Sequence, residues 1–158
     1  MKKIISVVAS IFLCSSLPSY AKQVVGIYET VSLPTKGLEL KAKIDSGAKN
    51  SSLHALNIKR YQQNNKEWVS FDTVGKKGET ISLSAPVARI AKIKRHNGIS
   101  QERPVIIVGI CIGNILRDVE VNLIDRSILN YPMLIGRTYL DGNFLIDVSK
   151  QYTAKPNC

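Results

Sequence analysis

The chain has 158 residues, of which 44% are hydrophobic and 22% charged, and its formal net charge is +10. This length is sufficient for one domain with a sizeable core. The positive charge by itself would fit a nucleic-acid or anionic surface. However, aromatic residues make up only 6% of the chain and do not interleave with the scattered lysines, as a base-stacking surface requires, so we expect no nucleic-acid partner.

The first 21 residues have the pattern of a secretory signal peptide. A basic start, Lys2-Lys3, precedes the mostly apolar residues 4–17 and the small-x-small cleavage site Ser19-Tyr20-Ala21. The apolar run is short for a transmembrane helix, so an uncleaved anchor is the weaker alternative. We expect a single mature domain, Lys22–Cys158, that is periplasmic or secreted and has no membrane span. Losing two lysines and no acids, it would carry a charge of +8.

Short alternating segments predict that the first part of the mature chain is almost entirely β. Trp68 lies in one of these segments and is available to the core. The polar segment Arg95–Glu102 contains Asn97-Gly98, a strong turn signal, and is our candidate flap or cleft-edge loop. The expected strands in this part are 24–32, 38–44, 53–60, 67–73, 80–83 and 87–94.

The clearest hairpin joins residues 104–112 and 115–124 through the two-residue turn Gly113-Asn114. Counting outward from this turn predicts the pairs Ile112–Ile115, Ile110–Arg117, Val108–Val119 and Ile106–Val121 on a largely apolar face. The other face should be wetter, because it carries Cys111, Gly109, Asp118 and Glu120.

The last part of the chain predicts a strand over 133–136, a short helical turn over 137–140 and a strand over 144–148. Short strands at this spacing suggest a small barrel or sandwich.

The segment most informative about function is Asp45-Ser46-Gly47-Ala48, at the end of the alternating strand 38–44. Gly47 permits a sharp bend close to a bound chain, and the Ser46 hydroxyl can donate a hydrogen bond. A carboxylate fixed in this way suits an aspartic protease, in which two such groups share a proton across a water. The alternative is an aspartate that only favours the turn.

A second segment, Leu134-Ile135-Gly136-Arg137, would let a strand pass close to this active loop. Together the two segments resemble the signature pair of retropepsin-like aspartic proteases. The resemblance is closer to a bacterial branch labelled "ATP-dependent zinc protease" or retropepsin-like aspartic endopeptidase, and it extends over 43–55, 102–106, 125–127, 131–137 and 144–149. It implies an all-β fold, a closed acid-protease barrel with one short C-terminal helical turn.

The resemblance also implies the site. Asp45 would be catalytic, and support of the active loop or contact with substrate would fall to Ser46, Gly47, Ala48, Glu102, Arg103, Gly136 and Arg137. Arg137 would brace the active loop through a carboxylate. Glu102 and Arg103 would lie near the cleft, or else form a surface pair of little energy. Retroviral enzymes carry acids where this chain has Lys49-Asn50, which leaves the substrate-backbone contacts of that position open.

Only one Asp-Ser-Gly or Asp-Thr-Gly occurs in the chain, whereas an aspartic dyad needs two carboxylates. The expected enzyme is therefore a homodimer that places Asp45 against Asp45 of its partner and hydrolyses peptide or protein substrates. The alternative is a catalytically inactive periplasmic binding module of the same fold, which would bind peptide, peptidoglycan or a protein partner. The oligomeric state separates the two.

The zinc-protease label can be tested by counting the residues that could bind zinc. A zinc hydrolase needs about three protein ligands, and this chain has two histidines, His54 and His96, and no His-Glu-x-x-His motif. It also lacks a phosphate-binding loop for ATP. We therefore expect no metal, no cofactor and a structural role for His54. A disulfide between the mature cysteines, Cys111 and Cys158, is allowed in an oxidising compartment but is not required by the spacing.

Overall fold

Strands provide nearly all the regular structure of the computed structural model, which describes residues 21–94 and 100–158. Two short helical elements interrupt them: a 3-10 turn η1 (Pro34–Lys36) and α1 (Arg137–Leu140). The expected mainly β chain is confirmed, and α1 coincides with the expected helical turn. The strands are β1 (Gln23–Val25), β2 (Tyr28–Leu33), β3 (Leu38–Ile44), β4 (Ser51–His54), β5 (Leu56–Gln63), β6 (Lys66–Val74), β7 (Thr80–Pro86), β8 (Arg89–Lys94), β9 (Ser100–Ile112), β10 (Ile115–Ile124), β11 (Met133–Ile135) and β12 (Phe144–Ile146).

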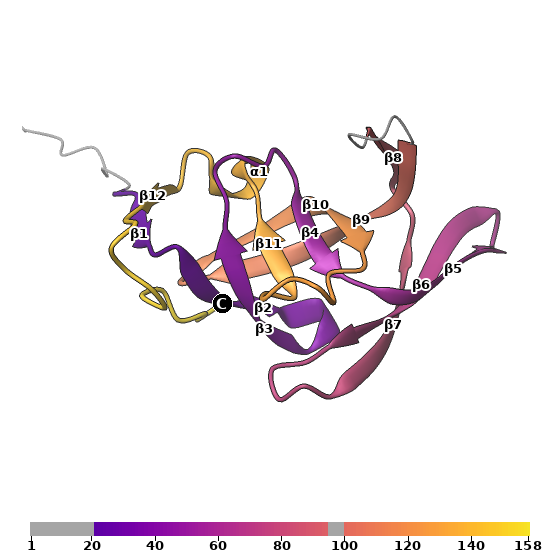
Figure 1. The fold of residues 1–158 in the computed structure, drawn as a ribbon, viewed down its shortest axis with the longest axis horizontal. Helices are drawn as coiled ribbons and strands as arrows, with labels where there is room; N and C mark the ends of the chain where they lie inside the picture. Colours follow the sequence, from indigo (N-terminus) through magenta and orange to yellow (C-terminus); the bar gives the residue numbers. More distant parts are fainter. Residues whose placement is uncertain (1–20, 95–99) are drawn as a thin grey trace, which may run out of the picture.

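A seven-stranded sheet in the order β10-β4-β11-β3-β2-β9-β8 forms the body of the molecule (Figure 1). β9 also pairs with β10, and it meets β2 through the single pair Ser32–Cys111. Within this sheet β3 lies between β2, to which it is antiparallel, and β11, to which it is parallel. The alternation of β3 fits this position, because every second residue from Leu38 to Ile44 is buried while Lys41 and Lys43 are exposed.

The β9–β10 hairpin has the predicted register, with Ile112 opposite Ile115 and Ile106 opposite Val121. The prediction that its second face is wet is wrong at Cys111 and Gly109, which are both buried. The C-terminal segment covers Cys111, to which it is covalently joined. Gly109 is covered by its neighbours across the hairpin, since a Cβ there would meet a carboxylate oxygen of Asp118 at 3.0 Å and a methyl carbon of Leu116 at 3.4 Å.

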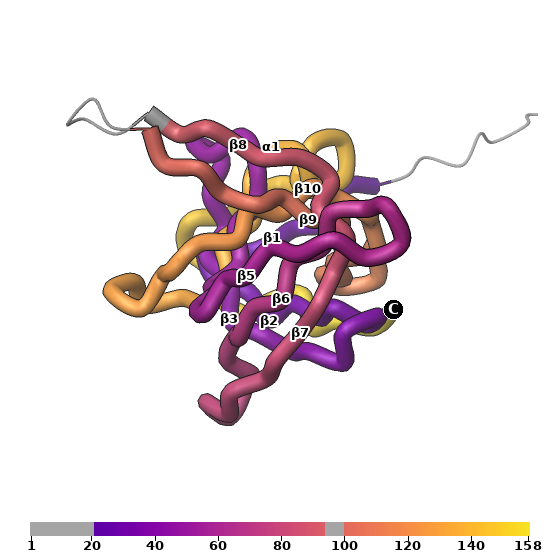
Figure 2. The backbone as a smooth tube through the Cα atoms, turned by 90° about the vertical axis from the view of Figure 1, so that its right-hand side faces the viewer, coloured from indigo at the N-terminus to yellow at the C-terminus, as the bar shows by residue number. Residues whose placement is uncertain are grey.

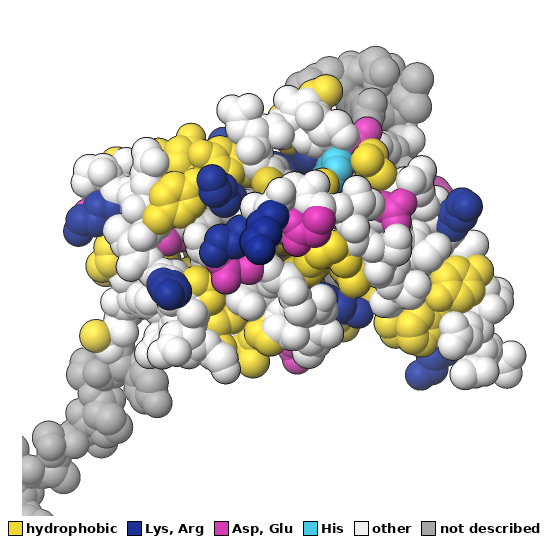
Figure 3. Space-filling view, turned by 90° about the horizontal axis from the view of Figure 1, so that it is seen from below, with side chains coloured by type: hydrophobic (Ala, Val, Ile, Leu, Met, Phe, Trp, Pro, Cys, Tyr) yellow, Lys and Arg dark blue, Asp and Glu magenta, His cyan; other side chains and the backbone are white. Residues whose placement is uncertain are grey.

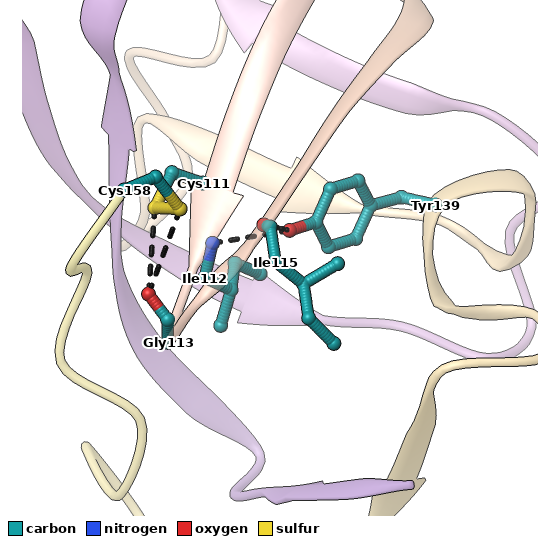
Figure 4. Close-up of a disulfide and its surroundings, with 6 residues drawn as sticks. All are labelled: Cys111, Ile112, Gly113, Ile115, Tyr139 and Cys158. Carbon is teal, nitrogen blue, oxygen red and sulfur yellow. Dashed lines mark hydrogen bonds between the residues drawn. A yellow bond between two sulfur atoms is a disulfide. The ribbon is translucent and has the colours of Figure 1, made fainter. Parts of the chain in front are cut away.

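A disulfide between Cys111 and Cys158, which the sequence left open, fastens the end of the chain to this hairpin (Figure 4). Tyr139 bonds to the same end of the hairpin: its hydroxyl accepts from the Ile112 N–H at 3.0 Å and donates to the Ile115 carbonyl at 2.8 Å (Figure 4). Burial raises the pKa of Tyr139, so the phenol stays protonated and can donate.

Glu29 fastens the two ends of the domain together from inside, because its carboxylate is fully buried and its oxygens accept four hydrogen bonds. The donors are the N–H of Gly26 at 2.6 Å, the N–H and hydroxyl of Thr153 at 3.1 and 2.7 Å, and the N–H of Ala154 at 3.0 Å. A buried carboxylate satisfied by several donors in this way stabilises the segments that supply them.

A smaller sheet, β5-β6-β7, projects from one end of the body (Figures 1 and 2). Its inner face, which includes Val69, Phe71 and Ala85, is part of the core. Two expectations differ here. The strand expected over 53–60 is divided at Ala55 between β4 and β5. Trp68 does not enter the core, because the alternation of β6 turns it to the half-exposed outer face.

No helix within the described ranges is long and apolar enough to cross a bilayer. Cationic and acidic side chains are interspersed on the face seen in Figure 3, where no single patch gathers the cations. This agrees with the scattered lysines of the sequence.

Candidate functional site

Asp45 stands at the point where β3 leaves the sheet. Its N–H donates to the Ile135 carbonyl at 2.9 Å, which continues the β3–β11 ladder by one residue. Its Oδ1 then accepts from the N–H groups of Gly47 at 2.9 Å and Ala48 at 3.2 Å. Among the described residues Oδ2 has no hydrogen-bond partner, and the side chain is half-buried. One oxygen thus orients the carboxylate while the other stays open.

Gly136 determines how closely the active loop packs against β11. A Cβ on Gly136 would lie 2.6 Å from the carbonyl carbon of Asn50 and 2.9 Å from the carbonyl oxygen of Lys49, so only glycine fits. The Gly136 N–H donates to the buried hydroxyl of Ser51 at 3.1 Å. Just beyond it, the N–H groups of Arg137 and Thr138 donate to the carbonyls of Ala48 and Lys49 at 2.9 and 3.0 Å. The loop is therefore held along its length.

Arg137 lies against the same loop, but not through the carboxylate that we expected. Its Nη1 donates to the carbonyl oxygens of Ser46 at 2.8 Å and Gly47 at 3.0 Å. These carbonyls point toward α1 because the turn directs the N–H groups of the loop at Asp45. A guanidinium can serve two acceptors at once, so it fixes the peptide units on either side of the turn. Ser46 itself is exposed, and a Cβ on Gly47 would contact only Asp45 Oδ1, at 3.1 Å.

Arg126 was not among the site residues taken from the sequence. Only 8% of its surface is exposed. Its Nη1 donates to the Ser52 hydroxyl at 3.0 Å and its Nε to the Tyr131 carbonyl at 3.0 Å. Burial lowers the pKa of Arg126, the positive charge of Arg103 lowers it further, and the negative charge of Asp45 opposes both. Arg126 therefore lies within electrostatic reach of Asp45.

A pocket of about 260 Å³ opens beside Arg126 on the outer face of the sheet. The register β3-β11-β4 aligns Lys43, Leu134 and Ser52 across this face. Asp45 follows Lys43 by two residues, so it belongs to the same face one pleat further along. The lining residues are Tyr28, Lys43, Arg126, Leu129, Asn130, Tyr131 and Leu134, which include two cations and no acid.

The tyrosines of this pocket are packed together. The rings of Tyr28 and Tyr131 stack with centroids 4.3 Å apart and an interplanar angle of 16°. Burial, together with hydrogen bonds to Tyr152 and Tyr28, raises the pKa of Tyr131 to about 12. The C-terminal segment thereby brings a side chain, Tyr152, to Tyr131.

A larger cavity of about 670 Å³ borders the active loop. Ser46, Lys49 and Arg137 contribute to it from the loop and from α1, and its apolar part is formed by Leu140, Phe144 and Ile146. With Lys22 and Arg117 added, its lining has four cations against the single acid Asp141. Both this cavity and the pocket beside Arg126 are therefore electropositive.

Glu102 and Arg103 are not brought together with Asp45 by any described contact. The Glu102 carboxylate lies 3.8 Å from Arg60 and 3.8 Å from Lys92, as an exposed surface group. Arg103 donates to Gln101 Oε1 from Nε at 3.1 Å and from Nη2 at 2.9 Å, and its charge reaches Arg126. The candidate flap Arg95–Glu102 has its tip, residues 95–99, outside the described residues.

His54 occupies the structural position that we expected. It is buried, and its Nδ1 accepts from the Arg126 N–H at 2.9 Å, so its proton resides on Nε2. Within residues 21–94 and 100–158 no three His, Cys, Asp or Glu side chains converge as a metal site would need. His96 lies outside those ranges.

Sequence reasoning missed Arg126, Ser51 and Ser52 because each is an ordinary polar residue in a strand or at its end. The one available signal was that all three fall within segments that carry the family resemblance, 43–55 and 125–127. Their roles depend on the β10-β4-β11 pairing, which joins segments far apart in the chain.

Known proteins are similar to this chain over most of its length. The model of a family described as RimB-like, retropepsin-like aspartic endopeptidase RimB, matches residues 24–157. Curated relatives named probable alpha-L-glutamate ligase are 34% identical over 135 residues in Desulfotalea psychrophila and 35% identical over 130 residues in Parasynechococcus marenigrum. These matches cover 83% and 80% of this chain but 29% and 28% of the relatives, so the chain spans less than a third of their length.

A solved structure is also similar. The crystal structure of a protein of unknown function from Legionella pneumophila has a TM-score of 0.72 and 32% sequence identity to this chain. The similarity covers 85% of this chain and 100% of the Legionella chain.

Proposed function

The chain belongs to the RimB-like family of retropepsin-like aspartic endopeptidases, and from this premise we propose that it hydrolyses peptide bonds with a water held between two Asp45 carboxylates. The observation that carries the proposal is the state of the Asp45 carboxylate. Its Oδ1 is fixed by two backbone N–H groups while its Oδ2 is open within the described chain. An oriented carboxylate with one free oxygen is what a general base for water requires.

The second carboxylate comes from a second copy of the chain. Because the sequence has one Asp-Ser-Gly, a two-fold axis through the active loop supplies the partner Asp45. Two carboxylates this close share one proton. The ionised Asp45 takes a proton from the water while the water oxygen attacks the peptide carbonyl carbon. The protonated Asp45 donates a hydrogen bond to the carbonyl oxygen. Each copy in this dimer would be the closed acid-protease barrel that the family resemblance implies.

The substrate that best suits the surroundings of Asp45 is an acidic, glutamate-bearing peptide. Lys43 and Arg126 line the pocket on the same face as Asp45, with no acid between them, so a carboxylate side chain bound there would be neutralised. The relatives named alpha-L-glutamate ligase support the same class of substrate, since a region like this chain forms part of each of them.

The proposed site of action is the periplasm or the exterior. The support is the signal-peptide pattern of residues 1–21, whose cleavage would leave Lys22 as the new N-terminus. N-terminal sequencing of protein recovered from the cell envelope tests this, and an intact Met1 on soluble cytoplasmic protein would refute it.

One experiment tests the catalytic proposal. The mature chain is weighed in solution by sedimentation equilibrium, and its cleavage of matched Glu-rich and Gln-rich peptides is followed between pH 4 and pH 8 with and without a chelator. We expect a dimer, preference for Glu-rich peptide, a maximum at mildly acidic pH, where one carboxylate of the pair is protonated, and no effect of the chelator. Absence of cleavage together with a monomeric mass would favour the binding module, and loss of activity on chelation would favour a metal hydrolase.

A further inference from the structure

The outer face of the β5-β6-β7 sheet carries three rows of side chains that the proposed cleavage does not use. Register places them across the strands: Lys59 lies opposite Ser70 and Ser70 opposite Ser84, while Tyr61 lies opposite Trp68 and Trp68 opposite Pro86. Residues two apart in a strand share a face, so these two rows are neighbours. In the third row Asp72 lies opposite Ser82, and Asn57 joins this row through a side-chain hydrogen bond to Asp72. The three rows are Tyr61-Trp68-Pro86, Lys59-Ser70-Ser84 and Asp72-Ser82 with Asn57.

The first row is apolar and accessible. Tyr61 is 37% exposed, Trp68 is half-exposed and Pro86 is exposed. Trp and Tyr side chains usually occupy the inner face of a sheet or an interface, where their large rings are covered. Here the inner face is already filled by Val69, Phe71 and Ala85, so the aromatic pair faces outward beside a polar surface.

The other two rows line a hollow of about 360 Å³. Its Asp72 carboxylate is fixed, since Oδ2 accepts from Asn57 Nδ2 at 2.8 Å and Oδ1 from the Ser82 hydroxyl at 2.6 Å. Each of these oxygens still has a lone pair. In the described part of the chain the Ser70 hydroxyl and the Lys59 ammonium group make no hydrogen bond. The hollow therefore offers both donors and acceptors.

The charge of this face differs from that of the pocket beside Arg126 and of the cavity that borders the active loop. Lys59 and Asp72 are the charged residues of its lining and cancel each other, whereas the chain carries +10. A balanced hollow attracts neither an acidic nor a basic ligand by its field. It suits a neutral molecule that has an apolar surface and several hydroxyl groups together.

We propose that this face binds a saccharide: a pyranose ring lies against Trp68 and Tyr61, and its hydroxyl groups bond to Ser70, Lys59 and Asp72. The faces of aromatic rings are electron-rich, so they attract the polarised C–H groups on one side of a sugar ring. A peptide partner would instead extend the sheet by pairing with the outer edge of β5.

Trp68 is the only tryptophan of the chain, so its fluorescence reports on this face directly. The mature protein is titrated with a tetramer of β-1,4-linked N-acetylglucosamine and, separately, with maltotetraose and an uncharged extended peptide. We expect a saturable blue shift with at least one sugar and a dissociation constant on the order of 1 mM. Tyr61→Ala should weaken binding about tenfold, and Ser70→Ala should weaken it less.

Two variants serve as controls. Tyr152→Ala removes a tyrosine of similar exposure, 44%, that does not line this hollow, and Asp45→Asn removes the proposed catalytic group. Both should bind sugar as the parent does, so the result is independent of the proposed peptidase activity. Circular dichroism verifies that each variant is folded, and Ser70→Ala replaces Tyr61→Ala if the latter is not.

Three outcomes would overturn the proposal. The first is no saturable response to either sugar in the folded parent. The second is a response that Ser70→Ala and Tyr61→Ala leave unchanged, which would place the sugar elsewhere. The third is a response to the extended peptide alone, which would assign the face to β-strand addition.

Discussion

Asp45 and Asp147 end two strands in the same local way. Each follows an isoleucine, Ile44 at the end of β3 and Ile146 at the end of β12. In each, Oδ1 accepts from the N–H two residues later, at 2.9 Å from Gly47 for Asp45 and at 3.0 Å from Ser149 for Asp147. This is the ordinary way in which an aspartate begins a turn.

The two carboxylates differ in whether an oxygen remains free to take part in a reaction. Asp147 also accepts from the Ser149 hydroxyl at 2.6 Å, and its Oδ2 lies 3.1 Å from Lys150 Nζ. The hydrogen bonds from Ser149, then that from Lys150, lower the pKa of Asp147 to about 2. Asp45 instead bonds a second backbone N–H and keeps Oδ2 open within the described chain. The same turn therefore leaves Asp147 saturated, with both oxygens bonded, and Asp45 available, with one oxygen free.

The largest effect should come from removing the available carboxylate. Asp45→Asn is nearly isosteric but cannot ionise, so peptide cleavage should fall about a thousandfold or more while the fold is kept. Asp147→Asn is the matched control and should retain cleavage. Initial rates on one Glu-rich peptide give both values. Equal losses of cleavage in the two variants would show that cleavage does not depend on the open oxygen of Asp45.

The next prediction concerns stability and the segment that contains Asp147. This segment leads into the tail joined to β9 by Cys111–Cys158, 47 residues apart, whereas the Asp45 loop is fixed by β11 and α1. The double variant Cys111→Ala/Cys158→Ala should lose about 3 to 4 kcal/mol of unfolding free energy in urea, by the loop-entropy argument. Cleavage at a temperature where the variant is folded should change little. A loss of cleavage in the folded variant would contradict this separation.

A third variant tests how the Asp45 loop is held. Gly136→Ala would force a Cβ to within 2.6 Å of the Asn50 carbonyl carbon, at a cost of about 1 to 3 kcal/mol, with a matching loss of cleavage as the loop moves. Gly47→Ala meets only Asp45 Oδ1 at 3.1 Å, and should affect cleavage more than stability. Thermal unfolding and cleavage rates compare the two. The reverse order of destabilisation would show that the loop does not pack as described.

Several parts of this structure followed from the sequence for clear physical reasons. The β3 strand and the β9–β10 hairpin are local, because alternation and a two-residue Gly-Asn turn determine them without reference to the rest of the fold. The close approach of Gly136 to the active loop was predicted from the family resemblance. The structure gives the reason, because the Asn50 carbonyl leaves no room for a Cβ at Gly136.

Other parts depended on contacts between distant segments. Arg126 donates a hydrogen bond to Ser52, 74 residues away, and the sequence around neither residue predicts this pair. Trp68 was assigned to the core because large aromatic residues are usually buried, but the alternation of β6 had to turn either Trp68 or Val69 outward. The C-terminal tail covers Cys111 only because the disulfide and Glu29 bring it there.

The smallest effect concerns the pH dependence of the saturated carboxylate. The pKa of Asp147 is lowered to about 2 in the folded chain, against about 3.9 for an unperturbed aspartate. The folded state therefore favours ionised Asp147, and this contribution to stability is complete above about pH 4 and is lost as the pH falls through about 2. Asp147→Asn lacks it. The difference in urea midpoint between the parent and Asp147→Asn should be constant near neutral pH, shrink below about pH 4, and reach its minimum below about pH 2. Ser149→Ala, which removes the hydroxyl that contributes most, should show a weaker version of the same profile. A difference that persists undiminished in strong acid would mean that Asp147 stabilises the turn through its shape and not through its charge.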